Sequence, residues 1–177
     1  MIPGRRRAWL RAACVLVAVA VYLNVWTTYA LYGLTEYGRY TQQQPGASTT
    51  AMGAEFRLVS LVQTTQLVNT STQEISSPPV NAVYVVARVD VVRRTADPNL
   101  FCVLEVLGPD RRLWEPSRDY VSRDTNTTCP AETMPLDSTW PLEIVFQVPE
   151  MYAGDLAGVV VNDPASREAR PVLVPPA

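Results

Sequence analysis

The feature that most constrains this chain is an uncharged stretch at residues 12–35, twenty-four residues long. A helix rises 1.5 Å per residue, so this stretch gives a helix of about 36 Å, enough to cross the roughly 30 Å hydrocarbon core of a bilayer. Arg5, Arg6, Arg7 and Arg11 precede it, and no comparable basic cluster follows. Because basic residues stay on the cytoplasmic side, the sequence predicts one transmembrane helix with a cytoplasmic N-terminus.

Two interpretations of this stretch compete. Aromatic residues such as Trp26 and Tyr29 gather toward its outer end, where such rings settle among lipid headgroups, and they favour a retained anchor. The alternative is a secreted protein with a cleaved signal peptide, in which residues 5–11 are the basic region, residues 14–23 the apolar region and residues 28–30 the cleavage signal. Both interpretations place the rest of the chain outside the cytoplasm.

Asn24 is the one strongly polar side chain in the stretch. Polar side chains within a bilayer often contact another helix, so Asn24 is a candidate contact with a partner helix. The alternative is that Asn24 faces a hydrated boundary or bonds its own backbone.

Charge and composition exclude several classes of function. Residues 36–177 contain eleven arginines against seventeen acids, a net charge of −6, which disfavours a nucleic-acid partner. The chain contains neither histidine nor lysine, so the Ser-His-Asp and Cys-His nucleophiles, imidazole metal ligands and the lysine Schiff base are all excluded. The sequence indicates no catalytic residue, no metal and no cofactor.

Cys102 and Cys129 are the two cysteines outside the apolar stretch. Two cysteines in an exported domain most simply form one disulfide, which in the chain-entropy model contributes roughly 3 to 4 kcal/mol. Two free thiols are the alternative.

The pattern of residues predicts four regions. They are a cytoplasmic basic tail at residues 1–11, the transmembrane anchor at residues 12–35, a linker at residues 36–54 and a β-sandwich at residues 55–177. The linker is rich in Gln, Thr, Gly and Ala and has no apolar period, so it is expected to act as a tether.

The clearest strand is predicted at residues 83–93, where five inward apolar residues alternate with Tyr84, Val86, Arg88, Asp90 and Val92. Residues 100–107, which include Cys102, are predicted to form a hairpin with residues 112–115. Further strands are expected at residues 55–68, 142–148, 156–161 and 170–174, and polar loops at residues 69–79 and 117–141. The disulfide would staple the long second loop to the hairpin strand.

About seven short strands separated by Pro, Gly and Asp turns predict an all-β extracytoplasmic domain, an immunoglobulin-like antiparallel β-sandwich. Some apolar residues fall on the outward strand faces: Val86, Val92, Phe101, Leu107 and Val145. In one interpretation other segments of the same chain cover them. In the other, they contact a partner protein or lipid.

The segments VNAVYVVARVDV, FCVLEVLGPDRRLW and VFQVPEMYAGDLAGVVV, together with Cys129-Pro130, carry a resemblance. The chain resembles actinobacterial membrane-anchored or secreted immunoglobulin-like domain proteins of unknown function, and is similar to the small immunogenic secreted sandwich proteins of mycobacteria. The resemblance implies the fold and the export of the domain, and it implies no activity.

Together these observations predict a non-catalytic, membrane-anchored interaction or accessory protein of the bacterial cell envelope, whose partner is another envelope membrane protein. Asn24 and a sandwich without a reactive centre motivate this hypothesis. The alternative is an extracytoplasmic binding module for a lipid or other envelope ligand, motivated by apolar residues on both strand faces.

Overall fold

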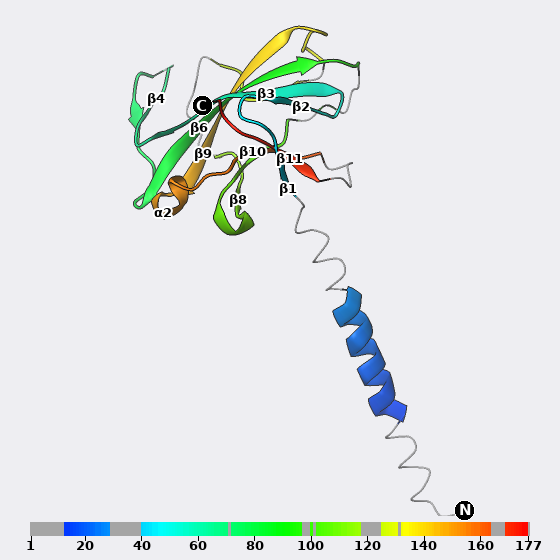
Figure 1. Ribbon diagram of the computed structural model, residues 1–177. Helices are drawn as coiled ribbons and strands as arrows, with labels where there is room; N and C mark the ends of the chain where they lie inside the picture. Colours follow the sequence, from blue (N-terminus) through cyan, green and yellow to red (C-terminus); the bar gives the residue numbers. More distant parts are fainter. Residues whose placement is uncertain are drawn as a thin grey trace, which may run out of the picture. The chain divides into compact units, whose positions relative to one another are not determined.

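The computed structural model describes residues 13–28, 40–70, 72–96, 100, 102–117, 125–130, 132–163 and 169–176. The chain divides into two compact units, Met1–Gly38 and Arg39–Ala177. The first unit contains a helix over residues 13–28, and the second contains the strands (Figure 1).

The helix at residues 13–28 is exposed along its whole length. Its apolar side chains include Leu16 and Tyr22, which are 70% and 67% exposed. Among the described residues, no helix combines the length and the apolar character needed to cross a membrane. The predicted anchor also includes residue 12 and residues 29–35, which lie outside the described residues, so a transmembrane span stays a prediction.

The second unit is a β-sandwich, as the sequence predicted. In order across the first sheet, its strands are β1 (Tyr40–Gln42), β11 (Arg170–Leu173), β10 (Gly158–Val161), β7 (Leu104–Leu107) and β8 (Leu113–Trp114). In order across the second sheet, its strands are β2 (Ser48–Ala51), β3 (Ala54–Thr64), β6 (Ala82–Arg93) and β9 (Thr139–Pro149). The sheets form two layers in Figure 1, where the four-stranded sheet is uppermost.

Three short elements complete the unit. A two-stranded ribbon consists of β4 (Leu67–Val68) and β5 (Ile75–Ser76). A 3₁₀ turn, η1 (Pro109–Arg111), joins β7 to β8, and a single helical turn, α2 (Glu150–Ala153), follows β9. The pairs within the two sheets are antiparallel, except that β1 pairs with β11 in parallel, which corrects the prediction of a purely antiparallel sandwich.

Strand β6 is central to the four-stranded sheet because it pairs with β3 on one side and with β9 on the other. The predicted alternation is confirmed: Val85 and Val89 point into the core and are almost fully buried. A register shift between Leu58 and Ser60 marks a bulge in β3. Because of this extra residue, the next inward-facing side chain after Leu58 is that of Leu61.

Apolar side chains from the facing sides of the two sheets fill the space between them. The largest fully buried members of this core are Phe56, Leu58, Leu104, Leu142, Phe146 and Leu173. They come from both sheets, so the core holds the two layers together.

The prediction that residues 36–54 form a linker is wrong from residue 40 onward, because β1 and β2 lie there and β3 begins at Ala54. Both are edge strands made mainly of Thr, Ser, Gln and Tyr, and each has exposed residues. Backbone pairing with β11 and β3 holds them in place, so they lack the apolar alternation by which buried strands are recognised.

Cys102 was predicted to lie on a strand, and this is also wrong. β7 begins at Leu104, two residues later, and Phe101 lies outside the described residues. At the other end of the long loop, β9 begins at Thr139, three residues before the predicted strand at residues 142–148.

Replacing Phe146 by alanine should lower the free energy of unfolding by about 3 to 5 kcal/mol, since Phe146 is fully buried between the sheets and its removal leaves a cavity. Val62, which is 54% exposed, is the matched control, and Val62→Ala should cost less than about 1 kcal/mol. Urea unfolding of both variants measures the difference. Equal losses would contradict the assignment of Phe146 to the core.

Candidate interaction surface

The predicted disulfide between Cys102 and Cys129 is confirmed. Their Cα atoms are 5.5 Å apart and 27 residues separate them in the sequence. Cys129 is 7% exposed and belongs to the core, against which Cys102 packs. The bond therefore ties the segment before β7 to the long loop. Cys14, on the N-terminal helix, is a free thiol.

The stapled loop covers the outer edge of β9. The Glu143 amide donates to the carbonyl oxygen of Asn126 at 2.9 Å, and the Ser117 amide donates to that of Val145 at 2.8 Å. The Trp140 indole donates to the carbonyl oxygen of Thr128 at 3.1 Å. These bonds use backbone groups that an open strand edge would offer to another chain, so this edge of the four-stranded sheet is protected.

The outward side of the four-stranded sheet is apolar at one end. Tyr84 and Val86 on β6 are 3% and 8% exposed because Leu67 of β4 packs on them, and Val145 of β9 lies against this cluster. The ribbon of β4 and β5 thus forms a small third layer. For Val86 and Val145, the interpretation that other segments of the chain cover the outward apolar residues is confirmed.

The other outward apolar residues have different surroundings. Leu107 is 5% exposed and lies on the five-stranded sheet, in a cluster with Val160 and Val172. Val92 is half-buried, and Phe101 lies outside the described residues.

The rest of this sheet face carries cross-strand ion pairs. Arg57 on β3 pairs with Asp90 on β6 at 2.8 Å, and Arg94 pairs with Glu55 at 2.7 Å and with Asp137 at 3.0 Å. Ser48 of β2 donates a hydrogen bond to Glu55 at 2.6 Å. All of these groups except Asp137 line a hollow of about 490 Å³, and they satisfy one another, which makes the region a rigid polar face.

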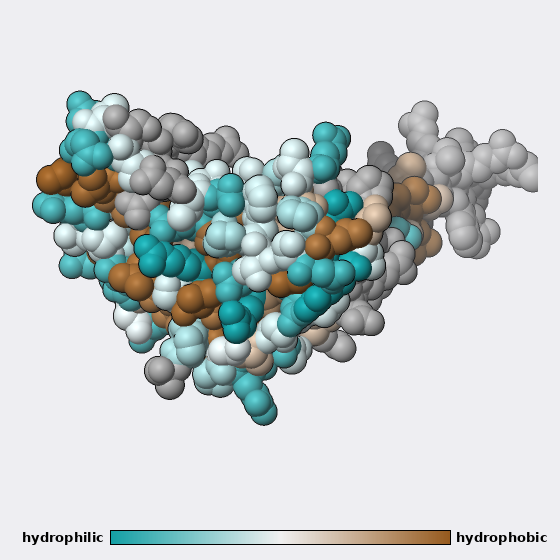
Figure 2. All heavy atoms as spheres, turned by 90° about the horizontal axis from the view of Figure 1, so that it is seen from above, coloured by the Kyte–Doolittle hydropathy of each residue, from teal (hydrophilic) through white to brown (hydrophobic). Residues whose placement is uncertain are grey.

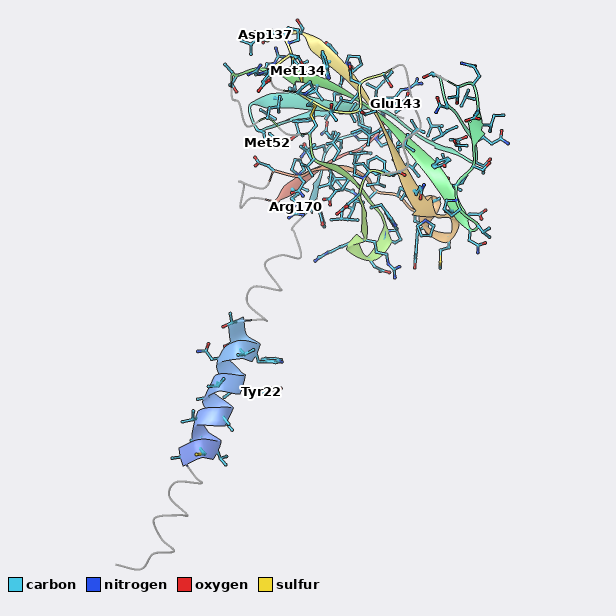
Figure 3. All side chains as sticks on the ribbon, turned by 180° about the vertical axis from the view of Figure 1, so that it is seen from behind. Tyr22, Met52, Met134, Asp137, Glu143 and Arg170 are labelled. Carbon is cyan, nitrogen blue, oxygen red and sulfur yellow. A yellow bond between two sulfur atoms is a disulfide. The ribbon has the colours of Figure 1, made fainter. Side chains whose placement is uncertain are left out.

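Arg88 on β6 pairs with Glu143 on β9 at 3.0 Å, with the guanidinium 61% exposed and the carboxylate 2% exposed. The prediction that Arg88 and Asp90 point outward is confirmed, and each pairs with a residue on a neighbouring strand. Glu143 and Asp137 lie at separate positions along the sheet (Figure 3), so the charges are spread over the face.

Two of these charges have shifted pKa values. The pKa of Glu55 is lowered, first by the hydrogen bond from the Ser48 hydroxyl and then by the hydrogen bonds from Arg94. The pKa of Arg94 is raised by its hydrogen bonds to Glu55 and Asp137. Both shifts favour the charged forms, so the network is stable near neutral pH.

Next to this polar face, the outer side of the ribbon is apolar and exposed. Val68 and Ile75 pair across the ribbon and are 43% and 61% exposed. Val62 on β3, opposite Val86, is 54% exposed. We call Val62, Val68 and Ile75 the ribbon surface. Figure 2 shows hydrophobic side chains in a broken band that begins at the left, the side on which β4 lies in Figure 1.

The ribbon was not predicted from the sequence, in which residues 69–79 read as a polar loop. Its two strands are two residues long, too short for a periodic pattern. The available signal was the apolar dipeptide Leu67-Val68 just before this region and the single apolar residue Ile75 within it.

Asn24, the sequence-based candidate for a helix contact, is exposed on the N-terminal helix, and its contact with a partner helix stays a prediction. Of the acidic residues near the long loop, Asp137 pairs with Arg94, and Asp110 lies in η1. In the part of the chain that the structure describes, no group of three or more His, Cys, Asp or Glu side chains could hold a metal ion.

A second hollow, of about 610 Å³, lies at one end of the sandwich, where Met52 and Arg170 come near each other (Figure 3). Its lining also includes Thr41, Thr50 and Asp163. The lining is largely polar, as in the hollow beside Glu55 and Arg94.

No protein-family model and no curated protein matches the chain. Among solved structures, the chain is similar to an uncharacterized beta-sandwich protein from Clostridium difficile 630. The two share 9% identity with a TM-score of 0.46, over 77% of this chain and 94% of the other. At this identity and overlap, the likeness says nothing about activity, and the predicted actinobacterial relationship gains no support from it.

Replacing Cys102 and Cys129 together by serine should lower the free energy of unfolding by about 2 to 4 kcal/mol, because the unfolded chain loses a covalent constraint. Replacing Cys14 by serine, the control, should leave stability within about 0.5 kcal/mol. Urea unfolding under non-reducing conditions measures both. Equal stability of the double variant and the wild type would contradict a structural role for the bond.

Acid should weaken the network around Glu55. Because its folded-state pKa lies below the ordinary value of 4.5, Glu55 contributes stability above that value and loses it as the pH falls through the folded pKa. Glu55→Gln should therefore flatten the fall in stability below about pH 4.5. Glu132→Gln, an exposed acid outside the network, is the control.

Glu105 should behave oppositely. Burial raises its pKa, so the folded state holds the proton more tightly and stability falls as the pH rises through the window above 4.5. Relative to the wild type, Glu105→Gln should therefore have a more favourable effect on the free energy of unfolding at pH 7 than at pH 4. Unfolding curves across this pH range test both carboxylates. If Glu55→Gln and Glu105→Gln changed the pH dependence of stability in the same direction, the opposite pKa shifts of the two groups would be contradicted.

Proposed function

We propose that the protein is a non-catalytic, membrane-anchored interaction or accessory protein of the bacterial cell envelope. The uncharged stretch at residues 12–35 anchors it, the four arginines before that stretch keep the N-terminus in the cytoplasm, and the sandwich lies outside. The Cys102–Cys129 disulfide supports export, since such bonds persist in oxidising compartments.

The observation that carries this proposal is the ribbon surface. Val68 and Ile75 expose apolar area on the ribbon, and Val62 exposes it on β3, whereas the charges of the same sheet, including Arg88, are already paired within the chain. A partner can bury this apolar area without breaking those ion pairs. The cluster of Leu67, Tyr84 and Val86 holds the ribbon in place, so little conformational entropy is lost on docking.

We also propose that the sandwich is immunoglobulin-like. After β6 the chain crosses to the other sheet for β7 and β8, returns for β9, and crosses again for β10 and β11. The resulting neighbours, β3-β6-β9 in one sheet and β11-β10-β7 in the other, follow the order of strands A-B-E and G-F-C of such folds. Membership of the actinobacterial exported family is part of the same proposal and rests on the resemblance of sequence alone.

The lipid-binding alternative needs an apolar groove. The hollow beside Glu55 is lined by Arg57, Asp90 and Arg94, and the second hollow by Thr41, Asp163 and Arg170 among others. Neither lining suits an acyl chain, so no observation favours this alternative over a protein partner.

Co-purification tests the proposal. Tagged full-length protein is isolated from its native membrane in mild detergent, next to the double variant Val68→Ser/Ile75→Ser and the control Val103→Ser, which changes another exposed valine. We expect a stoichiometric membrane-protein partner with the wild type and the control, and its loss with the double variant. Wild-type protein that carries no stoichiometric partner would contradict the proposal.

A second pair of samples tests whether the partner is bound through the ribbon surface or through the N-terminal helix. Here residues 12–35 are replaced by an unrelated membrane anchor, and Asn24→Leu is made in the native anchor. If Asn24 contacts the partner, both changes should weaken co-purification. Retention of the partner by both would confine the contact to the sandwich and contradict the role of Asn24.

A further inference from the structure

Three segments far apart in the sequence form one end of the sandwich. The Glu150 amide at the start of α2 donates to the carbonyl oxygen of Asn81, in the turn before β6, at 2.9 Å. On its other side α2 holds the β7–β8 hairpin, because the Arg112 guanidinium lies 4.4 Å from the centre of the Tyr152 ring and also donates to its hydroxyl. The Trp114 and Tyr152 rings are 5.9 Å apart.

Two apolar side chains protrude at this end. Val80 is 92% exposed and Met151 is 76% exposed, the highest values for large apolar residues in the described part of the sandwich. Each is next in sequence to one of the two residues, Asn81 and Glu150, that share the hydrogen bond, so they lie close to each other. Methionine is enriched in protein interfaces, and a rigid pair of apolar side chains suits the centre of one.

The backbone here is held in an uncommon conformation. Asn81, Asp110 and Arg111 have positive φ angles of 63°, 55° and 60°. Asn and Asp tolerate this region, but for arginine it is unfavourable, so the surrounding structure must hold Arg111 there. Gly108 packs against Trp114 so closely that a Cβ atom would lie 2.4 Å from the indole ring. The hairpin tip is thus fixed, which lowers the entropic cost of binding.

Four charged side chains at this end have no ion-pair partner among the described residues. Asp110, Arg111, Glu150 and Asp155 are exposed, and none of them forms an ion pair with another described residue. This contrasts with the face of the four-stranded sheet, where Arg57, Arg88 and Arg94 all have carboxylate partners. Unpaired charges of both signs surround the two apolar side chains.

A surface with an apolar centre and a rim of both signs is complementary to itself. In a twofold dimer the same patch meets its copy, so Val80 and Met151 would pack on their counterparts while Arg111 faces the copy's acids. Three exposed acids outnumber the two exposed arginines at this end, and residues 36–177 carry a net charge of −6. An anionic lipid surface is therefore a poor partner for it.

We propose that this end of the sandwich is a self-association surface that binds the same end of a second copy of the chain. We call it the α2 end, and it comprises Val80, Asp110, Arg111, Arg112, Glu150, Met151 and Asp155. It shares no residue with the ribbon surface, so the two proposed surfaces can be changed independently. With only two protruding apolar side chains at its centre, it is expected to have a dissociation constant in the micromolar range.

The test uses full-length protein in mild detergent, where the anchor does not restrict how two copies meet. Sedimentation velocity from about 1 to about 100 μM should show a concentration-dependent dimer. Val80→Asp/Met151→Asp should raise the dissociation constant at least about tenfold, and so should Arg111→Glu, which leaves the α2 end almost entirely acidic. Ile75→Asp, the same change on the ribbon surface, should leave it unchanged.

Thermal unfolding and an intact Cys102–Cys129 bond check that each variant is folded. A wild-type protein that stays monomeric throughout this range would overturn the proposal. A dimer that persists unchanged in the α2-end variants would overturn it too, because the N-terminal helix or the ribbon would then hold the copies together. A monomeric wild type would leave the ribbon surface available to an envelope partner, and the Ile75→Asp variant shows whether the ribbon holds a persisting dimer together.

Discussion

The architecture depends on β6, which is paired along most of its length on both sides and is buried on both faces over residues 83–87. Its inward residues, such as Val85 and Val89, fill the core between the sheets. Its outward residues divide into two groups: Tyr84 and Val86 support the ribbon, whereas Arg88 and Asp90 pair with neighbouring strands. The register of β6 thus determines which of its side chains fill the core, which support the ribbon and which form the polar face.

The sequence predicted those parts whose signal is local. The alternation in β6 shows a strand with one apolar face, and the two cysteines outside the apolar stretch indicate a disulfide, because each inference needs only neighbouring residues or composition. The edge strands β1 and β2 escaped prediction because backbone pairing with distant strands holds their polar residues. The ribbon escaped for a similar reason: Leu67 and Ile75 look like the ends of a loop until Tyr84 and Val86 are placed beneath β4.

The candidate surfaces could not be read from the sequence because exposure depends on packing. Val86 and Val68 are both valines in apolar neighbourhoods, yet Val86 is 8% exposed and Val68 is 43% exposed. Charge is equally ambiguous, since arginines on the sheet face are paired while Arg111 at the α2 end forms no ion pair with a described residue. The division between a self-satisfied polar face and two surfaces open to partners therefore emerged only from the three-dimensional structure.

The proposed export to an oxidising compartment would link the predicted anchor, the sandwich and the proposed role, and a Cys102–Cys129 bond in the protein from its native cells would report on it. The most direct measurement is peptide mapping of the protein from its native cells, with rapid alkylation of free thiols before lysis and no reductant. The account predicts that Cys102 and Cys129 are recovered joined to each other and that Cys14 alone is alkylated. Alkylated Cys102 and Cys129 would contradict it, because the domain would then reside where thiols stay reduced.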